Sequence, residues 1–103
     1  QRGKVRVKLL YSSFFWMEDI IRVIEESASG PLYSVLKRQD EKFVTEHAYD
    51  NPRFVEDVVR EVYLALRNFP LEKPFEWFSV EAENEESIHN HNAYAYTEYN
   101  SQD

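Results

Sequence analysis

The chain has 103 residues, 43% of them hydrophobic, and a chain of this length forms one small domain without room for a second core. Twelve basic residues against nineteen acidic ones give a formal charge of −7, which disfavours nucleic acid as a partner. The absence of cysteine excludes disulfides and finger-type zinc sites, and no apolar run approaches the ~20 residues of a membrane span, so we expect a cytoplasmic protein without membrane contact.

The first half of the chain predicts a strand followed by a helix. Residues 4–9 alternate Lys or Arg with Val or Leu, which is typical of a strand with one solvated face. Glu18 and Asp19 carry the negative charge that a helix start favours, apolar residues follow at positions 20, 21, 23 and 24, and Gly30-Pro31 predicts the end of this helix. A short helix is also predicted between Asp40 and Tyr49.

The second half predicts a long helix and two strands. Asn51-Pro52 is typical of a helix cap followed by proline at the first helical position. The helix is predicted to end near Asn68, and period-two alternation over residues 75–83 and 91–99 predicts two strands. Its apolar stripe has three- and four-residue spacing and consists of Phe54, Val55, Val58, Val59, Val62, Tyr63 and Leu66.

The predicted order is therefore strand, helices, strand, strand. This order indicates an α+β fold in which an antiparallel sheet packs its apolar face against helices on one side. Residues 1–99 are expected to form this single module, and residues 100–103, which have no pattern, are expected to be a frayed tail. Aromatic residues make up 16% of the chain, and so many large side chains favour an additional subunit contact.

The densest group of polar functional side chains lies at residues 81–91, between two predicted strands. His89 and His91 have the His-x-His spacing that places both rings on one face of a strand. With a nearby carboxylate, two imidazoles suit zinc, manganese or iron, and they serve equally well in proton transfer. A solvated acidic turn with two surface histidines explains the same pattern.

Three further sites have both an ordinary and a functional interpretation. Glu56 and Asp57 complement the dipole at a helix start, but a carboxylate there would also accept paired hydrogen bonds from an amidine-like edge such as that of guanine. Lys37-Arg38 is interpreted either as part of a charged loop or as a phosphate contact. His47, beside apolar neighbours, is interpreted as a packed or surface histidine rather than a ligand.

Three blocks of sequence resemble the type IB GTP cyclohydrolases. They are residues 31–46 (PLYSVLKRQDEKFVTE), residues 48–57 (AYDNPRFVED) and residues 86–94 (ESIHNHNAY). The resemblance spans this whole chain but only the C-terminal part of the longer family polypeptide. It implies a tunnelling-fold module that forms the C-terminal half of a bimodular subunit, within a homotetramer whose active sites lie at subunit interfaces.

The resemblance also implies the reaction and the residues that perform it. The family converts GTP to 7,8-dihydroneopterin triphosphate and formate by metal-assisted hydrolysis, at the start of folate and queuosine-type biosynthesis. By position, Glu56 matches the acid that anchors guanine, and His89 and His91 match histidines at the rim of the active site. Metal-site carboxylates are implied at Glu41 and Glu86, and triphosphate contacts at Lys37 and Arg38.

The resemblance has one important gap. The family's metal-site Cys and His lie upstream of the segment that begins near Gln1, so this chain is expected to need the N-terminal part of the polypeptide and to be inactive alone. Two alternatives stay open. One is an archaeal-type cyclohydrolase that yields a cyclic phosphate, and the other is a non-catalytic tunnelling-fold assembly domain.

Overall fold

A computed structural model gives the fold of the chain. It describes residues 2–28, 32–39, 42–50, 55–85 and 92–101. For residues 2, 28, 32–39, 49, 50, 85 and 92, the backbone alone is described.

Within these ranges the chain forms a five-stranded antiparallel sheet and two helices. The elements are β1 (Arg2–Leu10), α1 (Met17–Ala28), β2 (Leu32–Gln39), β3 (Lys42–Asp50), α2 (Val55–Arg67), β4 (Trp77–Glu85) and β5 (Asn92–Asn100). The strand order is β2-β3-β1-β4-β5, so β1 is the central strand. It pairs with β3 along one edge and with β4 along the other.

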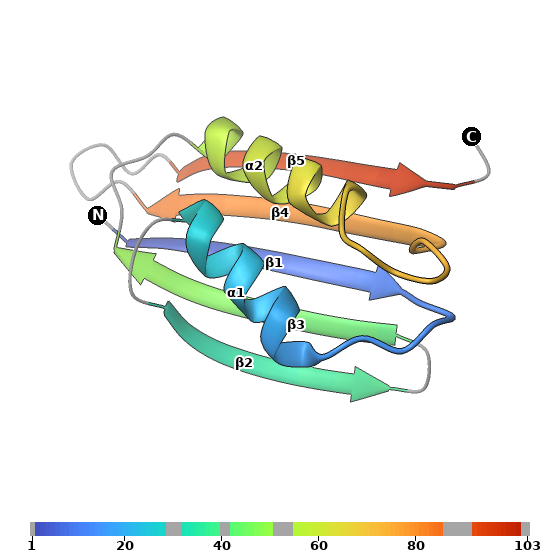
Figure 1. Cartoon of the computed structure of the whole chain (residues 1–103). Helices are drawn as coiled ribbons and strands as arrows, with labels where there is room; N and C mark the ends of the chain where they lie inside the picture. Colours follow the sequence, from blue (N-terminus) through green and yellow to red (C-terminus); the bar gives the residue numbers. More distant parts are fainter. Residues whose placement is uncertain (1, 29–31, 40–41, 51–54, 86–91, 102–103) are drawn as a thin grey trace.

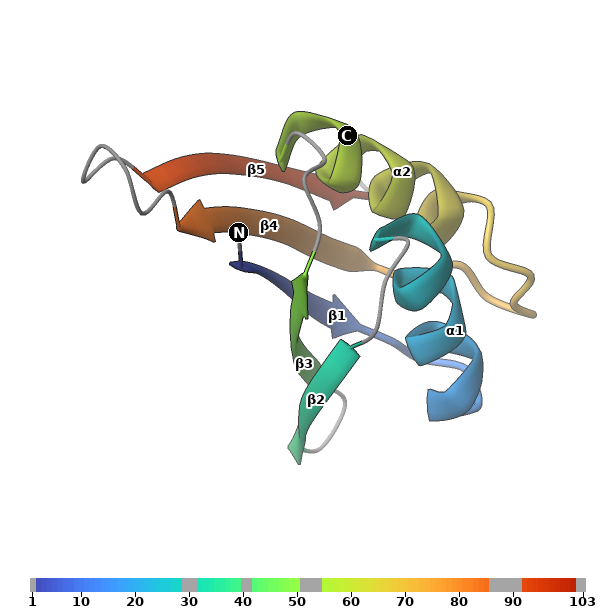
Figure 2. The same cartoon turned by 90° about the vertical axis from the view of Figure 1, so that its left-hand side faces the viewer.

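Both helices cover the same face of the sheet. α1 lies in front of β1 and β3, and α2 lies in front of β4 and β5 (Figure 1). In the side view both helices lie on the same side of the strands, and no described helix lies on the other side (Figure 2). This two-layer arrangement confirms the predicted α+β class with helices on one face, as in a tunnelling-fold module.

The core lies between the helices and the covered face. Alternate residues of the central strand, Val5, Val7 and Leu9, are completely buried, because their side chains all point toward the helices. Ile20 and Ile24 face them from α1. The helix α2 contributes Val55, Val58, Val59, Val62 and Leu66, which confirms the predicted stripe, and α2 ends at Arg67, next to the predicted Asn68. Phe54, Asn51-Pro52 and Gly30-Pro31 lie outside the described residues.

The strands predicted over residues 4–9, 75–83 and 91–99 are confirmed as β1, β4 and β5. The prediction for the middle of the chain is wrong, because residues 42–50 form strand β3 instead of a short helix, and strand β2 was not predicted. At the other end, Ser101 donates a hydrogen bond from its amide to the carbonyl oxygen of Glu76 at 3.0 Å. Residues 102–103 of the predicted tail are not described.

Strand β3 was not predicted because two of its inward-facing residues are polar. Phe43, Thr45 and His47 alternate on the core side and are fully buried, but two of the three are polar, so the period-two pattern of hydrophobicity is hidden. The two polar groups satisfy each other, because Thr45 Oγ1 lies 2.7 Å from His47 Nε2. A buried hydrogen bond of this kind makes the inward position tolerable for both residues.

Candidate functional site

The first turn of α2 presents two neighbouring acids that differ in their surroundings. Asp57 Oδ1 accepts a hydrogen bond from Arg60 Nη2 at 2.8 Å, within the same helix. Glu56 is exposed, and its carboxylate forms no hydrogen bond or ion pair with another described residue. Of the two acids, Glu56 is therefore the one whose oxygens face solvent and are available to a ligand.

The predicted histidines belong to the connection between β4 and β5. His89, His91 and Glu86 all lie outside the described residues. The connection is anchored by Glu85 and Asn92, which pair with each other across the hairpin, and Glu85 also pairs with Arg2. Figure 1 shows the end of β4 and the start of β5 at the same end of the sheet as the start of α2. The element that carries Glu56 and the strands that lead to the histidines thus meet at one end.

Lys37 and Arg38 belong to the opposite end of the sheet. Lys37 and Arg38 lie in β2, at register positions opposite Val44 and Phe43, and Glu41, outside the described residues, immediately precedes Lys42 in the sequence. Lys42 pairs with Leu10, the last residue of the central strand.

The start of β3 and the end of the sheet beside Glu56 are a strand length apart. β3 has 9 residues, and at ~3.3 Å per residue its first and last residues are about 26 Å apart. The start of β3 is beside Glu41 in sequence, whereas its end pairs with Arg2 at the Glu56 end. A single copy of this fold therefore does not bring the β2–β3 end of the sheet to the start of α2.

His47 is confirmed as a packed histidine. Its side chain has no exposed surface, and burial lowers the pKa of His47 to about 4, because the protonated ring would lose its hydration. The neutral ring is the form that shares a hydrogen bond with Thr45.

The helix-free face of the sheet carries a charged network that the sequence pattern did not identify. Arg6 Nε donates to Glu46 Oε2 at 2.9 Å and Arg6 Nη1 donates to Glu81 Oε1 at 3.0 Å. The hydroxyl of Tyr94 donates to Glu81 Oε2 at 2.7 Å, and this bond raises the pKa of Tyr94. Alternation placed Arg6 on a solvated face, but its acidic partners are 40 and 75 residues away in sequence, so only the strand register reveals the network.

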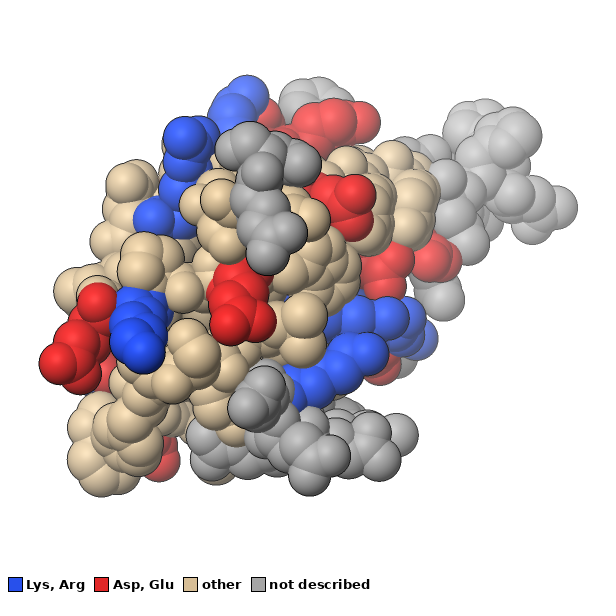
Figure 3. Space-filling model, turned by 90° about the vertical axis from the view of Figure 1, so that its right-hand side faces the viewer, with Lys and Arg blue, Asp and Glu red and all other residues tan. Residues whose placement is uncertain are grey.

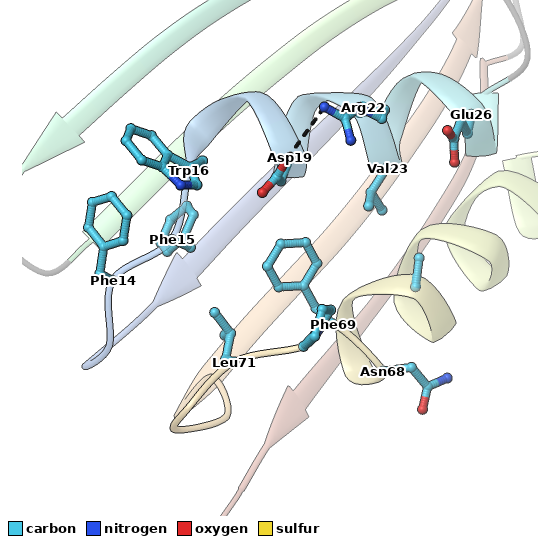
Figure 4. A pocket seen from close by; sticks show the side chains of 12 residues that line it. Phe14, Phe15, Trp16, Asp19, Arg22, Val23, Glu26, Asn68, Phe69 and Leu71 are labelled. Carbon is cyan, nitrogen blue, oxygen red and sulfur yellow. Dashed lines mark ion pairs between the residues drawn. The ribbon is translucent and has the colours of Figure 1, made fainter.

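A cavity of about 660 Å³ lies on the other side of the molecule. It lies between α1 and the segment that follows α2, and exposed Phe14 and Trp16 form one end of it (Figure 4). The ion pair of Asp19 with Arg22, at 3.5 Å, borders the same cavity. Among the described residues, no predicted site residue lines it, so we do not assign it to the predicted chemistry.

The part of the chain that the structure describes contains no group of three or more His, Asp or Glu residues arranged to hold a metal ion. The two predicted metal-site carboxylates, Glu41 and Glu86, lie outside that part. The described residues by themselves therefore do not fit a metal centre. None of the described helices is long and apolar enough to cross a membrane.

Comparison with known proteins decides the family. The model of the family described as type I GTP cyclohydrolase folE2 matches residues 1–95. The chain belongs to this family. The resemblance stated from the sequence is confirmed at this level, whereas the type IB assignment, the metal dependence and the C-terminal placement stay predictions.

Relatives in the FolE2 family are highly similar to this chain. Proteins named GTP cyclohydrolase FolE2 from Syntrophus aciditrophicus (strain SB), Geobacter sp. (strain M21) and Fervidobacterium nodosum are 61%, 60% and 57% identical over 98, 95 and 95 residues. These matches cover 95%, 92% and 92% of this chain, but only 37%, 34% and 35% of the relatives. The chain thus spans about a third of the length of the FolE2 proteins that it matches.

Proposed function

We propose that this chain is the substrate-binding part of a GTP cyclohydrolase that converts GTP to 7,8-dihydroneopterin triphosphate and formate. The proposal is carried by membership of the FolE2 family, together with one structural observation. An exposed carboxylate without a partner among the described residues, that of Glu56, stands at the start of α2. In this proposal the chain is the C-terminal half of a bimodular subunit that acts at the start of folate-type biosynthesis in the cytoplasm.

Glu56 binds the guanine base in this proposal. The N1–H and exocyclic amino group of guanine are two parallel donors, which match the two oxygens of one carboxylate. Asp57 is adjacent, but its carboxylate is already bonded to Arg60. A carboxylate that has no hydrogen-bond partner within the protein loses no existing hydrogen bond when it binds the base.

His89 and His91 transfer protons in this proposal. Opening the imidazole ring of guanine and releasing formate require protonation of a departing nitrogen, and imidazole is suited to this task near neutral pH. The proposal is supported by the placement of β4 and β5, whose adjoining ends lie at the same end of the sheet as Glu56.

The proposal includes dependence on a divalent ion, zinc, manganese or iron. Because the described residues do not fit a metal centre, its ligands are expected at Glu41 and Glu86 and in the Cys and His of the N-terminal part of the family polypeptide. We assign none of the described residues a role in binding this ion or in a step that depends on it.

A shared site is proposed for the assembled protein. The start of β3, which follows Glu41 in sequence, and the end of the sheet beside Glu56 are a strand length apart, so a second module must supply one of the two acids if both serve the same GTP. A homo-oligomer with active sites between subunits meets this requirement.

Paired substitutions test the role of Glu56. The full-length protein is incubated with GTP and Mn²⁺, Zn²⁺ or Fe²⁺, and oxidised pterin is followed by its fluorescence. Glu56→Gln keeps the size of the side chain and replaces one acceptor oxygen by a donor, so we expect kcat/KM to fall by about a hundredfold or more. Asp57→Asn, the matched control, is expected to change kcat/KM by less than about threefold, because Asp57 serves Arg60 on an exposed helix surface.

Removal of the metal tests the second part of the proposal. Treatment with EDTA followed by desalting should abolish turnover, and adding back one of the three ions should restore it. Failure of the wild-type protein to form pterin with any of these metals would remove the proposed activity. Equal losses in Glu56→Gln and Asp57→Asn would remove the guanine-binding role of Glu56 alone.

A further inference from the structure

We propose that Lys8 and Lys42 form a binding site for the phosphate chain of the nucleotide, on the helix-free face of the sheet. Because the ligand is taken to be a nucleoside triphosphate whose guanine binds Glu56 of another copy, the inference rests on the proposed function and its shared site. It adds two binding residues that neither the sequence pattern nor the family resemblance assigned.

The strand register brings the two lysines together. Lys8 pairs with Val44, and Lys42 is two residues before Val44 on the same strand, so the lysines are diagonal neighbours with Cα atoms ~7–8 Å apart. Both lysines are on the helix-free face. Lys42 pairs with Leu10, and Leu10, two residues after Lys8, is on the same face as Lys8. Two flexible side chains at this spacing can reach the oxygens of one phosphate chain.

A third lysine position adjoins the pair. Val44 pairs with Lys8 on one side and with Lys37 on the other. Together with Lys42, this places three lysine positions around one residue. Arg38, its neighbour in sequence, is opposite Phe43, a fully buried core residue. Of the two predicted triphosphate contacts, Lys37 is therefore the one whose place in the sheet agrees with the proposed site.

The charges around these lysines are not neutralised within the described residues. Neither Lys8 nor Lys42 forms an ion pair or hydrogen bond with another described residue. The carboxylates diagonal to Lys8, Glu46 and Glu81, are both bound by Arg6. The register partners of Lys8 are the uncharged Val44 and Ser79. Asp40 and Glu41, which precede Lys42 in sequence, lie outside the described residues.

The two lysines belong to a chain with a formal charge of −7. Figure 3 shows a patch of Lys and Arg atoms on the side of the sheet that the helices leave open, with Asp and Glu atoms beside it, and further Lys and Arg atoms on the helix side. Neighbouring like charges repel each other and destabilise the fold, and a bound polyanion would turn that repulsion into attraction. The ammonium group of lysine acts as a point charge and is suited to binding phosphate oxygens.

Lys4 provides a matched control on the same strand and the same face. Its register partner on β4 is Glu83, and it borders a small cavity together with Glu46 and Glu81. An anion at Lys4 would be repelled by Glu83, whereas the register partners of Lys8 carry no charge. Removing the charge of Lys4 changes the net charge of the chain by the same amount as removing that of Lys8, but it leaves the proposed site intact.

The test measures binding of inorganic tripolyphosphate to the full-length protein by calorimetry, in a buffer that contains EDTA. Lys8→Gln and Lys42→Gln should each raise the Kd by about tenfold, as expected for loss of one charge-assisted contact. Lys4→Gln should raise it by less than about twofold, and Lys8→Arg should preserve binding. Orthophosphate should bind more weakly than tripolyphosphate, because it cannot span both lysines, and added salt should weaken both.

Three outcomes would overturn the inference. They are no binding of tripolyphosphate by the wild-type protein, an unchanged Kd in Lys8→Gln and Lys42→Gln, or an equal loss in Lys4→Gln, which would indicate a general effect of net charge. The proposed function is judged separately by turnover. Pterin formation with an unchanged KM for GTP in both variants refutes the phosphate site only. Lysine-dependent binding of tripolyphosphate without any turnover refutes the proposed activity only.

Discussion

The buried imidazole of His47 links the stability of the fold to pH. In the folded chain its pKa is about 4, whereas in the unfolded chain it is ~6.5. Between these values the unfolded state binds the proton and the folded state does not, so the free energy of unfolding falls as pH falls from 6.5 to 4. A shift of this size corresponds to about 3 kcal/mol, lost in that range and retained in full above it.

Urea unfolding at pH 7.5, 6.0 and 5.0 measures this contribution. Carboxylates also titrate toward the acid end, so the informative quantity is the difference between the wild type and His47→Gln, which keeps a polar partner for Thr45 but does not titrate. We expect this difference to shrink as pH falls. A difference that stays constant with pH would mean that His47 is not held neutral by the fold.

The same residue shows why part of the fold was not predictable from single positions. The alternation of β1, with Lys4, Arg6 and Lys8 outward, follows the rule that polar residues face solvent, and this strand was predicted. In β3 the rule is reversed at Thr45 and His47, whose polarity is satisfied by a hydrogen bond between them. Local pattern cannot indicate that two polar groups will be buried as a bonded pair.

At the scale of elements, α2 was predictable because its stripe is long and purely apolar. Strand β2, in contrast, is at the edge of the sheet and has a mixed sequence, LYSVLKRQ, without regular alternation. Its position is decided by pairing with β3 rather than by its own composition. An edge strand of this kind can be identified only after its neighbour is known.

Packing of α2 against the sheet leads to an element-scale prediction. Leu66 is 2% exposed and lies in the core, whereas Leu64, two residues earlier, is 47% exposed. Leu66→Ala leaves a cavity and should lower the free energy of unfolding by about 2–5 kcal/mol. Leu64→Ala removes the same atoms from the surface and should change it by less than about 0.5 kcal/mol. Both values come from urea denaturation at pH 7.5, and equal losses would contradict the packing of α2.

At the scale of the whole molecule, the sequence predicted candidate site residues but not their separation. Glu56 and Glu41 are 15 positions apart in sequence, which suggests proximity. Strand β3 intervenes between them and extends the chain from one end of the sheet to the other. Because β3 was predicted as a short helix, this consequence was not foreseen.

The separation predicts complementation between copies. Full-length Glu41→Gln and Glu56→Gln should each be inactive, because every site lacks one acid. If one copy supplies Glu41 and another supplies Glu56, subunits of the two variants mixed in equal amounts should regain about a quarter of the wild-type turnover, since one site in four then has both acids. The subunits are exchanged by mild denaturation and refolding.

Refolded samples of each variant alone serve as the controls and should stay inactive. A mixture that also stays inactive, although native mass spectrometry shows mixed oligomers, would contradict a site shared in this way between copies. Turnover well above a quarter would indicate that one of the two acids is dispensable.

The order of strands in the sheet also bears on how the protein is made. Arg6 in the central strand bonds to residues 40 and 75 positions later, so β1 leaves the ribosome before both of its neighbours, and β4 is the later of the two. Until β4 has been synthesised, one edge of β1 has no partner, and pairings so distant in sequence form slowly. We therefore expect a nascent chain that stops before β4 to depend on chaperones, because one edge of its central strand has no hydrogen-bonding partner.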